Sequence, residues 1–127
     1  MEGEISKSLD GIKAVFLDLD GTIYLGDSLI DGALDFLGRL QERGIKRYFL
    51  SNNSSKSVEQ YLEKLRGLGI NAGKDEVLLS THDLISWLSE KEVTSTFLVG
   101  TEGMRSMLEE EGIDTSAERP EFVVLGY

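Results

Sequence analysis

The chain alternates short apolar runs with longer stretches in which apolar residues recur at a helical spacing. Apolar runs rich in β-branched and aromatic residues predict strands at 14–20, 45–52, 76–80, 96–100 and 121–127. Apolar residues three or four apart predict helices at 33–44, 53–69, 81–91 and 102–112. Turn residues around a short apolar piece predict a loop or small hairpin at 21–32. Strands that alternate with helices indicate parallel βαβ units, and therefore an α/β fold.

Cap residues and apolar spacing indicate how the helices begin and which side they bury. Ser57 and Gln60 have the spacing of a capping box at the start of the helix in 53–69. Ser80 or Thr81 is expected to cap the helix at 81–91. In the helix at 33–44, the apolar residues 33, 34, 37 and 40 recur at a helical spacing. The helix at 53–69 places five apolar residues on one face: Val58, Tyr61, Leu62, Leu65 and Leu68.

The first predicted strand ends in two carboxylates, within the sequence FLDLDGT at 16–22. The run 14–20 is expected to be buried on both faces, where Asp18 and Asp20 cost stability unless something compensates their charge. Asp-Gly is by itself a common turn signal. Residues two apart in a strand point the same way, and a turn at Gly21 brings Asp20 above Asp18. Thr22 can form a local hydrogen bond that fixes the turn. The stretch therefore favours a cation site in which one carboxylate attacks phosphorus and the other transfers protons.

The second predicted strand ends in Ser51, Asn52 and Asn53, directly before a helix. In doubly wound sheets, ligands lie outside the carboxyl ends of the strands, so these residues and the aspartates are expected to face one crevice. A hydroxyl, amides and a helix start favour an anion there, and they also serve as a helix cap. Carboxylates opposite an anion require a cation between them, and Mg²⁺ suits this arrangement of oxygen ligands.

Composition restricts the classes of partner. The formal net charge is −10, from 23 acidic and 13 basic residues, and no basic stripe is present, which argues against a nucleic-acid partner. A small phosphorylated substrate, neutralised locally, remains compatible with this charge. The absence of cysteine excludes disulfides and thiolate metal sites and fits a cytoplasmic location.

Membrane and export segments are not expected. No stretch approaches the roughly 18 apolar residues of a membrane span, so no membrane partner is expected. Residues 1–10 form a polar lead-in, and the first 13 residues have no apolar region typical of a signal peptide.

These motifs resemble a known family. FLDLDGT resembles the DxDGT motif of the haloacid dehalogenase-like hydrolases, and FLSNNSS resembles their second motif. The pairing of DLDGTIYLG with SNNSS is similar to the subgroup of 4-nitrophenylphosphatase-like and NagD-like phosphatases, and EFVVLGY to a segment of its cap domain. The resemblance begins near residue 13. It implies a Rossmann-like three-layer α/β/α core with a parallel sheet, whose N-terminal part spans 1–80, and the first part of an inserted α/β cap at 81–127.

The resemblance also implies an activity, that of a Mg²⁺-dependent phosphomonoester hydrolase acting through an aspartyl-phosphate. Asp18 would be the nucleophile and a Mg²⁺ ligand. Asp20 would be the general acid and base, and its carbonyl would also bind Mg²⁺. Thr22 would orient Asp20.

The second motif would hold the phosphoryl group. Ser51, together with backbone N–H groups near Gly21 and Asn52, would bind the phosphoryl oxygens. Asn53 would be a further substrate contact. This arrangement corresponds to in-line displacement with the charge held by a metal and by dipoles.

The sequence departs from the family in two elements. The family uses a lysine after the cap and an acidic GDxxxTD-like segment, and neither occurs in this sequence in that context. We therefore expect an N-terminal fragment of such an enzyme, with weak activity or none. The first strand is then expected to be an apolar edge, which favours self-association into a homo-oligomer.

Two alternatives come from other functional classes. A phospho-accepting domain of receiver type also uses acidic residues and Mg²⁺, but the third predicted strand ends in EVLLS without an aspartate. A catalytically inactive binding protein could keep the same fold. Phosphate release, stable self-phosphorylation or neither would distinguish the three.

Overall fold

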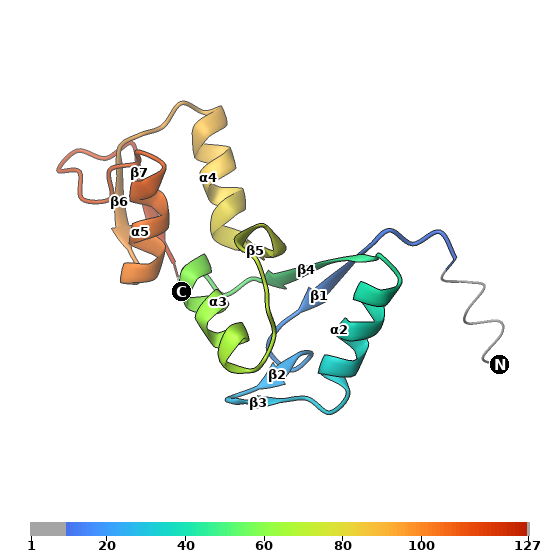
Figure 1. The fold of residues 1–127 in the computed structure, drawn as a ribbon. Coiled ribbons are helices and arrows are strands. Elements are labelled where there is room, and N and C mark those ends of the chain that lie inside the picture. Colours follow the sequence, from blue (N-terminus) through green and yellow to red (C-terminus); the bar gives the residue numbers. More distant parts are fainter. Residues whose placement is uncertain (1–9, 127) are drawn as a thin grey trace.

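Two parallel sheets with helices packed against them form the fold (Figure 1). The computed structural model describes residues 10–126. Most of the predicted polar lead-in, and Tyr127 at the end of the last predicted strand, lie outside the described residues. The predicted α/β class with parallel strands is confirmed.

The first sheet has the strand order β1-β4-β5, and all its strands run parallel. Its strands are β1 (Ala14–Asp18), β4 (Lys46–Ser51) and β5 (Val77–Leu79). Its helices are α2 (Ala33–Glu42), α3 (Val58–Gly67) and the short η1 (Lys74–Glu76). The loop predicted after the first strand contains an antiparallel hairpin of β2 (Tyr24–Leu25) and β3 (Ser28–Leu29).

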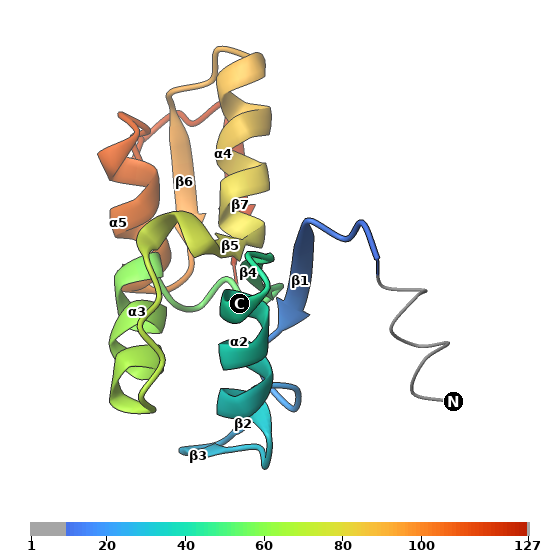
Figure 2. The same cartoon turned by 45° about the vertical axis from the view of Figure 1, so that its right-hand side comes forward.

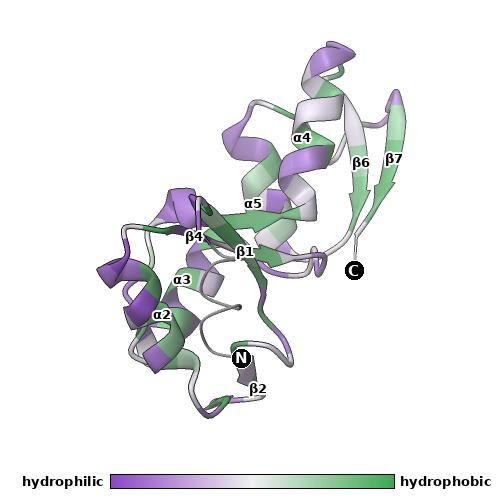
Figure 3. Cartoon of the chain, turned by 90° about the vertical axis from the view of Figure 1, so that its right-hand side faces the viewer, coloured by the Kyte–Doolittle hydropathy of each residue, from purple (hydrophilic) through white to green (hydrophobic). Residues whose placement is uncertain are grey.

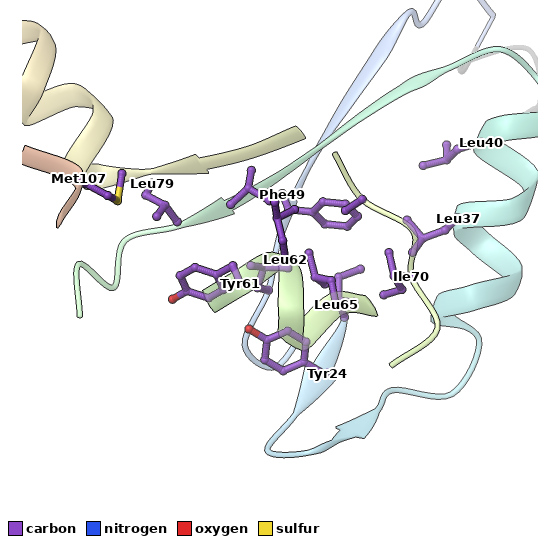
Figure 4. Packing of buried hydrophobic residues seen from close by; sticks show 14 residues of the cluster. Tyr24, Leu37, Leu40, Phe49, Tyr61, Leu62, Leu65, Ile70, Leu79 and Met107 are labelled. Atoms are coloured by element: carbon purple, nitrogen blue, oxygen red, sulfur yellow. The ribbon is translucent and has the colours of Figure 1, made fainter. Parts of the chain in front are cut away.

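Helices α2 and α3 bury their apolar sides against one face of this sheet (Figure 4). Phe49 in the central strand and Leu65 in α3 are fully buried. The predicted capping box is confirmed, since the Ser57 N–H donates to Gln60 Oε1 at 2.8 Å and the Gln60 N–H donates to Ser57 Oγ at 3.3 Å. The helical spacing of residues 33, 34, 37 and 40 is confirmed by α2, in which Ala33, Leu37 and Leu40 are buried and Leu34 is 48% exposed.

The first strand is not buried on both faces, which corrects the sequence prediction. Phe16 is 60% exposed and stacks on Tyr48, with ring centroids 5.3 Å apart. The reason is that β1 is an edge strand, and its outward face lies opposite the helices. Figure 3 shows β1 as a strongly hydrophobic strand. The prediction of an apolar edge is therefore confirmed.

The second sheet pairs β6 with β7 and packs against two helices (Figure 2). Its elements are α4 (Ser80–Glu90), β6 (Thr96–Val99), α5 (Glu102–Glu110) and β7 (Phe122–Leu125). Leu88 and Leu108 are fully buried in its core. Neither Ser80 nor Thr81 caps α4, because β5 runs directly into the helix and Leu79 occupies the N-cap position.

The two sheets lie on either side of the boundary predicted at residue 80. Their assignment to a core and to the first part of a cap remains a prediction. Within residues 10–126, no helix has the length and apolar character needed to cross a membrane.

Candidate active site

Polar side chains end two neighbouring strands of the first sheet. Asp18 is the last residue of β1 and is in register with Leu50 of β4, so Ser51 lies one residue further along the adjacent strand. Because the strands are parallel, both side chains lie at the carboxyl edge of the sheet, where α/β proteins bind ligands. The carboxylate of Asp18 is exposed, whereas Ser51 is 8% exposed.

A tight turn after β1 presents the second carboxylate. The Leu19 carbonyl accepts hydrogen bonds from the N–H groups of Thr22 at 3.1 Å and Ile23 at 2.9 Å. Gly21 has a φ of 81°, which side-chain-bearing residues rarely adopt, and its N–H donates to the Tyr24 carbonyl at 2.8 Å. Leu19 is fully buried while Asp18 and Asp20 on either side of it are exposed, as strand alternation predicts.

The Ser51 hydroxyl has two polar neighbours. The Asn53 N–H donates to Ser51 Oγ at 3.1 Å, and the Tyr61 hydroxyl lies 2.9 Å from the same oxygen. Tyr61 projects from α3, whose first turn is held by the capping box. The serine hydroxyl is thereby fixed at the edge of the sheet from both the following loop and the following helix.

Two buried tyrosines lie close enough to the aspartates to be affected by their charge. Burial raises the pKa of Tyr24, and the charges of Asp20 and Asp18 raise it further. Burial also raises the pKa of Tyr61, where the hydrogen bond between Tyr61 and Ser51 acts in the opposite direction and the charges of Asp20 and Asp18 add to the increase. Figure 4 shows both rings in the core cluster of the first sheet. The charges of Asp18 and Asp20 thus act on both phenols, and Ser51 is hydrogen-bonded to one of them, Tyr61.

Both asparagines accept hydrogen bonds that hold the loop after Ser51. The Asn52 carbonyl accepts from the Ser80 hydroxyl at 3.3 Å, which links this loop to the start of α4. Asn53 Oδ1 accepts from the Ser55 N–H at 2.9 Å and so shapes the loop before α3. In this structure, both residues order the loop that follows Ser51.

The oxygen donors fit a hard divalent cation in part. Asp18 and Asp20 offer carboxylate oxygens. The backbone bridge between Asp20 and Tyr24 uses the carbonyls of Leu19 and Tyr24, so it does not use the Asp20 carbonyl. Mg²⁺ commonly binds through one or two carboxylates together with substrate phosphate and water, which matches this donor set. Among residues 10–126, no cluster of three or more acidic, histidine or cysteine ligands is present.

A depression of about 480 Å³ lies at the opposite end of these strands, bounded by Lys46, Arg47 and Glu76. Two of its charged groups, Arg47 and Glu76, are paired with each other. Arg47 Nε pairs with Glu76 Oε2 at 3.1 Å, and the same guanidinium donates to the Asn71 carbonyl at 2.8 Å. These contacts hold the loop before β5, and we assign the chemistry to the carboxyl edge instead.

Sequence reasoning missed the two tyrosines as neighbours of the site. Tyr61 was predicted only as part of the apolar face of α3, and Tyr24 was given no role. A buried tyrosine hydroxyl usually has a polar partner. Ser51 is a polar residue at the end of a strand that precedes α3. That rule could therefore have suggested that Tyr61 and Ser51 are hydrogen-bonded to each other.

A family model and curated proteins match most of this chain. The family model for haloacid dehalogenase-like hydrolases matches residues 15–114. An acid sugar phosphatase from Staphylococcus aureus is 38% identical over 116 residues, which cover 90% of this chain and 45% of that protein. The chain therefore spans less than half the length of the curated relatives it matches.

Solved structures of phosphatases share the fold of this chain. The crystal structure of a 4-nitrophenylphosphatase from Thermotoga maritima matches with a TM-score of 0.88 and 38% identity, over 94% of this chain and 46% of that one. A glycerol phosphate phosphatase from Mycobacterium tuberculosis, solved in complex with magnesium, matches with a TM-score of 0.82 and 26% identity, over 91% of this chain and 36% of that one. The aspartates and the serine lie within the matched range, and the chain belongs to the haloacid dehalogenase-like hydrolases.

Proposed function

We propose that this chain carries the nucleophile and a phosphate-binding side of a Mg²⁺-dependent phosphomonoester hydrolase that acts on a small phosphorylated metabolite. The observation that carries the proposal is the register of β1 and β4, which brings Asp18 and Ser51 to the same sheet edge. The names of its relatives, an acid sugar phosphatase and a 4-nitrophenylphosphatase, support a phosphatase.

The reaction takes two displacements at phosphorus. The Asp18 carboxylate attacks phosphorus in line with the ester oxygen, the ester P–O bond breaks, and protonated Asp20 gives its proton to the leaving alcohol. Water then attacks the aspartyl-phosphate while the Asp20 carboxylate accepts a proton from it. The bond between the Asp18 oxygen and phosphorus breaks, inorganic phosphate is released, and Asp18 and Asp20 return to their starting protonation states.

The surrounding groups stabilise the charge on the transferred phosphoryl group. The Asp18 carboxylate and the Asp20 carbonyl would hold Mg²⁺, which neutralises phosphoryl charge when bound. The Ser51 hydroxyl donates to a phosphoryl oxygen, and the Asn52 backbone and Asn53 lie beside it. Gly21 contributes the turn that carries Asp20, since its N–H is already donated to Tyr24.

We also infer the partners and the location of the enzyme, and the activity of this chain alone. A net charge of −10 disfavours nucleic acid as a partner, and the lack of cysteine fits a cytoplasmic location. Turnover by these 127 residues alone is expected to be weak or absent, because the sequence has no GDxxxTD-like segment to complete the metal shell. β5 ends without a carboxylate, so no observation favours a receiver-type domain.

The test is Mg²⁺ and phosphate binding, followed by amide NMR, together with turnover of 4-nitrophenyl phosphate. We expect Mg²⁺ with inorganic phosphate to shift the signals of residues 18–22 and 51–53. Asp18→Asn should weaken Mg²⁺ binding at least about tenfold, because it removes a charged ligand. Asp27→Asn is the matched control, since Asp27 is an exposed carboxylate in the neighbouring hairpin. Shifts confined to other residues, or turnover that survives Asp18→Asn, would contradict the proposal.

A further inference from the structure

The hydrogen-bonding capacity of Ser51 is limited, and its neighbours already use most of it. A hydroxyl group has one hydrogen to donate and two lone pairs to accept with. The Asn53 N–H can only donate, so its 3.1 Å contact occupies one lone pair of Ser51 Oγ. The contact with Tyr61 Oη at 2.9 Å then takes either the second lone pair or the hydrogen. The direction of this one bond decides what Ser51 can offer to a ligand.

The two directions have opposite consequences for an anion. If Ser51 donated to Tyr61, only a lone pair would remain at the sheet edge, and a lone pair repels a phosphoryl oxygen. If Tyr61 donates to Ser51, both lone pairs are occupied and the serine hydrogen remains for the ligand. Only the second direction makes Ser51 a donor at the site.

The surroundings of Tyr61 favour its role as the donor. Its ring is 1% exposed, and Lys56 Nζ lies 5.8 Å from the ring centroid, so the position of the phenol is fixed by packing. The ordinary pKa of a phenol is about 10, so Tyr61 carries a hydrogen that it can donate at neutral pH. A phenol is also a stronger hydrogen-bond donor than an aliphatic hydroxyl group.

We propose that Tyr61 is a positioning residue that donates its hydroxyl hydrogen to Ser51 Oγ and thereby directs the Ser51 hydrogen toward the phosphoryl oxygen. The inference rests on the proposed function for its consequence, but the direction of the bond is a property of the chain itself. Tyr61 does not touch the substrate, and its effect passes entirely through Ser51.

Neutron diffraction from deuterated crystals of the chain tests the direction of the bond without any activity. We expect the deuterium between the two oxygens to be bonded to Tyr61 Oη. A deuterium bonded to Ser51 Oγ and directed at Tyr61 would overturn the proposal. This result does not depend on whether the chain turns over a substrate.

A binding cycle tests the consequence, with inorganic phosphate in the presence of Mg²⁺ as the probe. We expect Tyr61→Phe to weaken binding about three- to tenfold, the equivalent of one hydrogen bond, and Ser51→Ala to weaken it by at least as much. The double variant should be no weaker than Ser51→Ala, because Tyr61 acts only through that serine. Tyr48→Phe, which removes a hydroxyl from a ring stacked on Phe16 on the outer face of the sheet, is the control and should change binding less than about twofold.

The outcomes separate the two proposals. Additive losses in the double variant, or an unchanged affinity in Tyr61→Phe while Ser51→Ala weakens binding, would overturn the role of Tyr61. Failure of the unsubstituted chain to bind phosphate at all would instead contradict the proposed function, and the neutron map would still decide the direction of the bond.

Discussion

The two sheets of this chain share an architecture but differ at the carboxyl ends of their strands. In the first sheet, β1 and β4 end in Asp18 and Ser51. In the second sheet, β6 and β7 end in Val99 and Leu125, which are apolar and 49% and 79% exposed. Parallel strands flanked by helices therefore provide the scaffold in both regions, while the polar strand ends occur in only one of them.

The two regions are alike in leaving one sheet face open. Phe16 and Leu78 are exposed on the outer face of the first sheet. Phe97 and Val123 are exposed on the outer face of the second. Neither sheet has helices on both faces within residues 10–126, so burial on the helix-covered side should carry most of the stability.

The largest contrast is expected between two phenylalanines that lie on opposite faces of their sheets, one on the helix-covered face and one on the open face. Phe49 in β4 is fully buried, whereas Phe97 in β6 is 46% exposed. Phe49→Ala should lower the free energy of unfolding by about 3–5 kcal/mol, because it leaves a cavity in the core. Phe97→Ala should cost less than about 1 kcal/mol. Urea unfolding measures both, and equal losses would show that the outer face is covered in solution.

Alkaline pH should destabilise the first region selectively. Tyr24 and Tyr61 have a pKa raised above 10.0 in the folded chain, so the folded state holds these protons more tightly than the unfolded state. The contribution of these two tyrosines to the free energy of unfolding is fully present below about pH 10. It is lost as the pH rises above that value, by up to about 1.4 kcal/mol per pH unit for each tyrosine. Residues 80–126 contain no tyrosine.

Urea unfolding across this pH range, with amide exchange to locate the opening, provides the measurement. The double variant Tyr24→Phe/Tyr61→Phe should flatten the pH dependence. Tyr48→Phe should not, because its ring lies on the outer face against Phe16. An unchanged slope in the double variant would show that other groups cause the alkaline loss.

The elements were predictable from the sequence where local signals and burial agree. Ser57 and Gln60 indicated the start of α3 because a capping box depends on residues three apart. The exposure of Phe16 was not predictable, because it depends on which side of the sheet the helices cover. The cap expected at Thr81 failed because β5 enters α4 without a loop.

The site was predictable in outline for a topological reason. Parallel strands bring their carboxyl ends to one edge, so Asp18 and Ser51 were expected to face one another across neighbouring strands. The bond between Ser51 and Tyr61 depends on how α3 packs onto the sheet, which the spacing of apolar residues does not specify.

The junction between the two regions depends on a glycine. A Cβ at Gly103 would clash with Gln60 Oε1 and would lie 2.9 Å from the Ser57 N atom, so the start of α5 packs directly on the capping box of α3. Gly103→Ala should destabilise the chain by about 1–3 kcal/mol, since the backbone must shift. Gly38→Ala in α2, where the added methyl meets open space, should instead stabilise it by about 0.5–1 kcal/mol. Thermal unfolding compares the two, and a neutral Gly103→Ala would mean that the regions are not held together at this point.

The smallest effect should come from the hydroxyl that links the two regions. Thr101 Oγ1 accepts from the Met104 N–H at 3.3 Å, which caps α5, and donates to the Ser55 carbonyl in the loop after Ser51 at 2.6 Å. Thr101→Ala should cost about 1 kcal/mol, the usual value of a lost cap, and should speed amide exchange in the loop before α3. Thr101→Ser keeps both hydrogen bonds and should behave like the unsubstituted chain. If Thr101→Ala destabilised α5 without changing exchange in that loop, the contact would be only a cap, and the second region would not contribute to ordering the loop that follows Ser51.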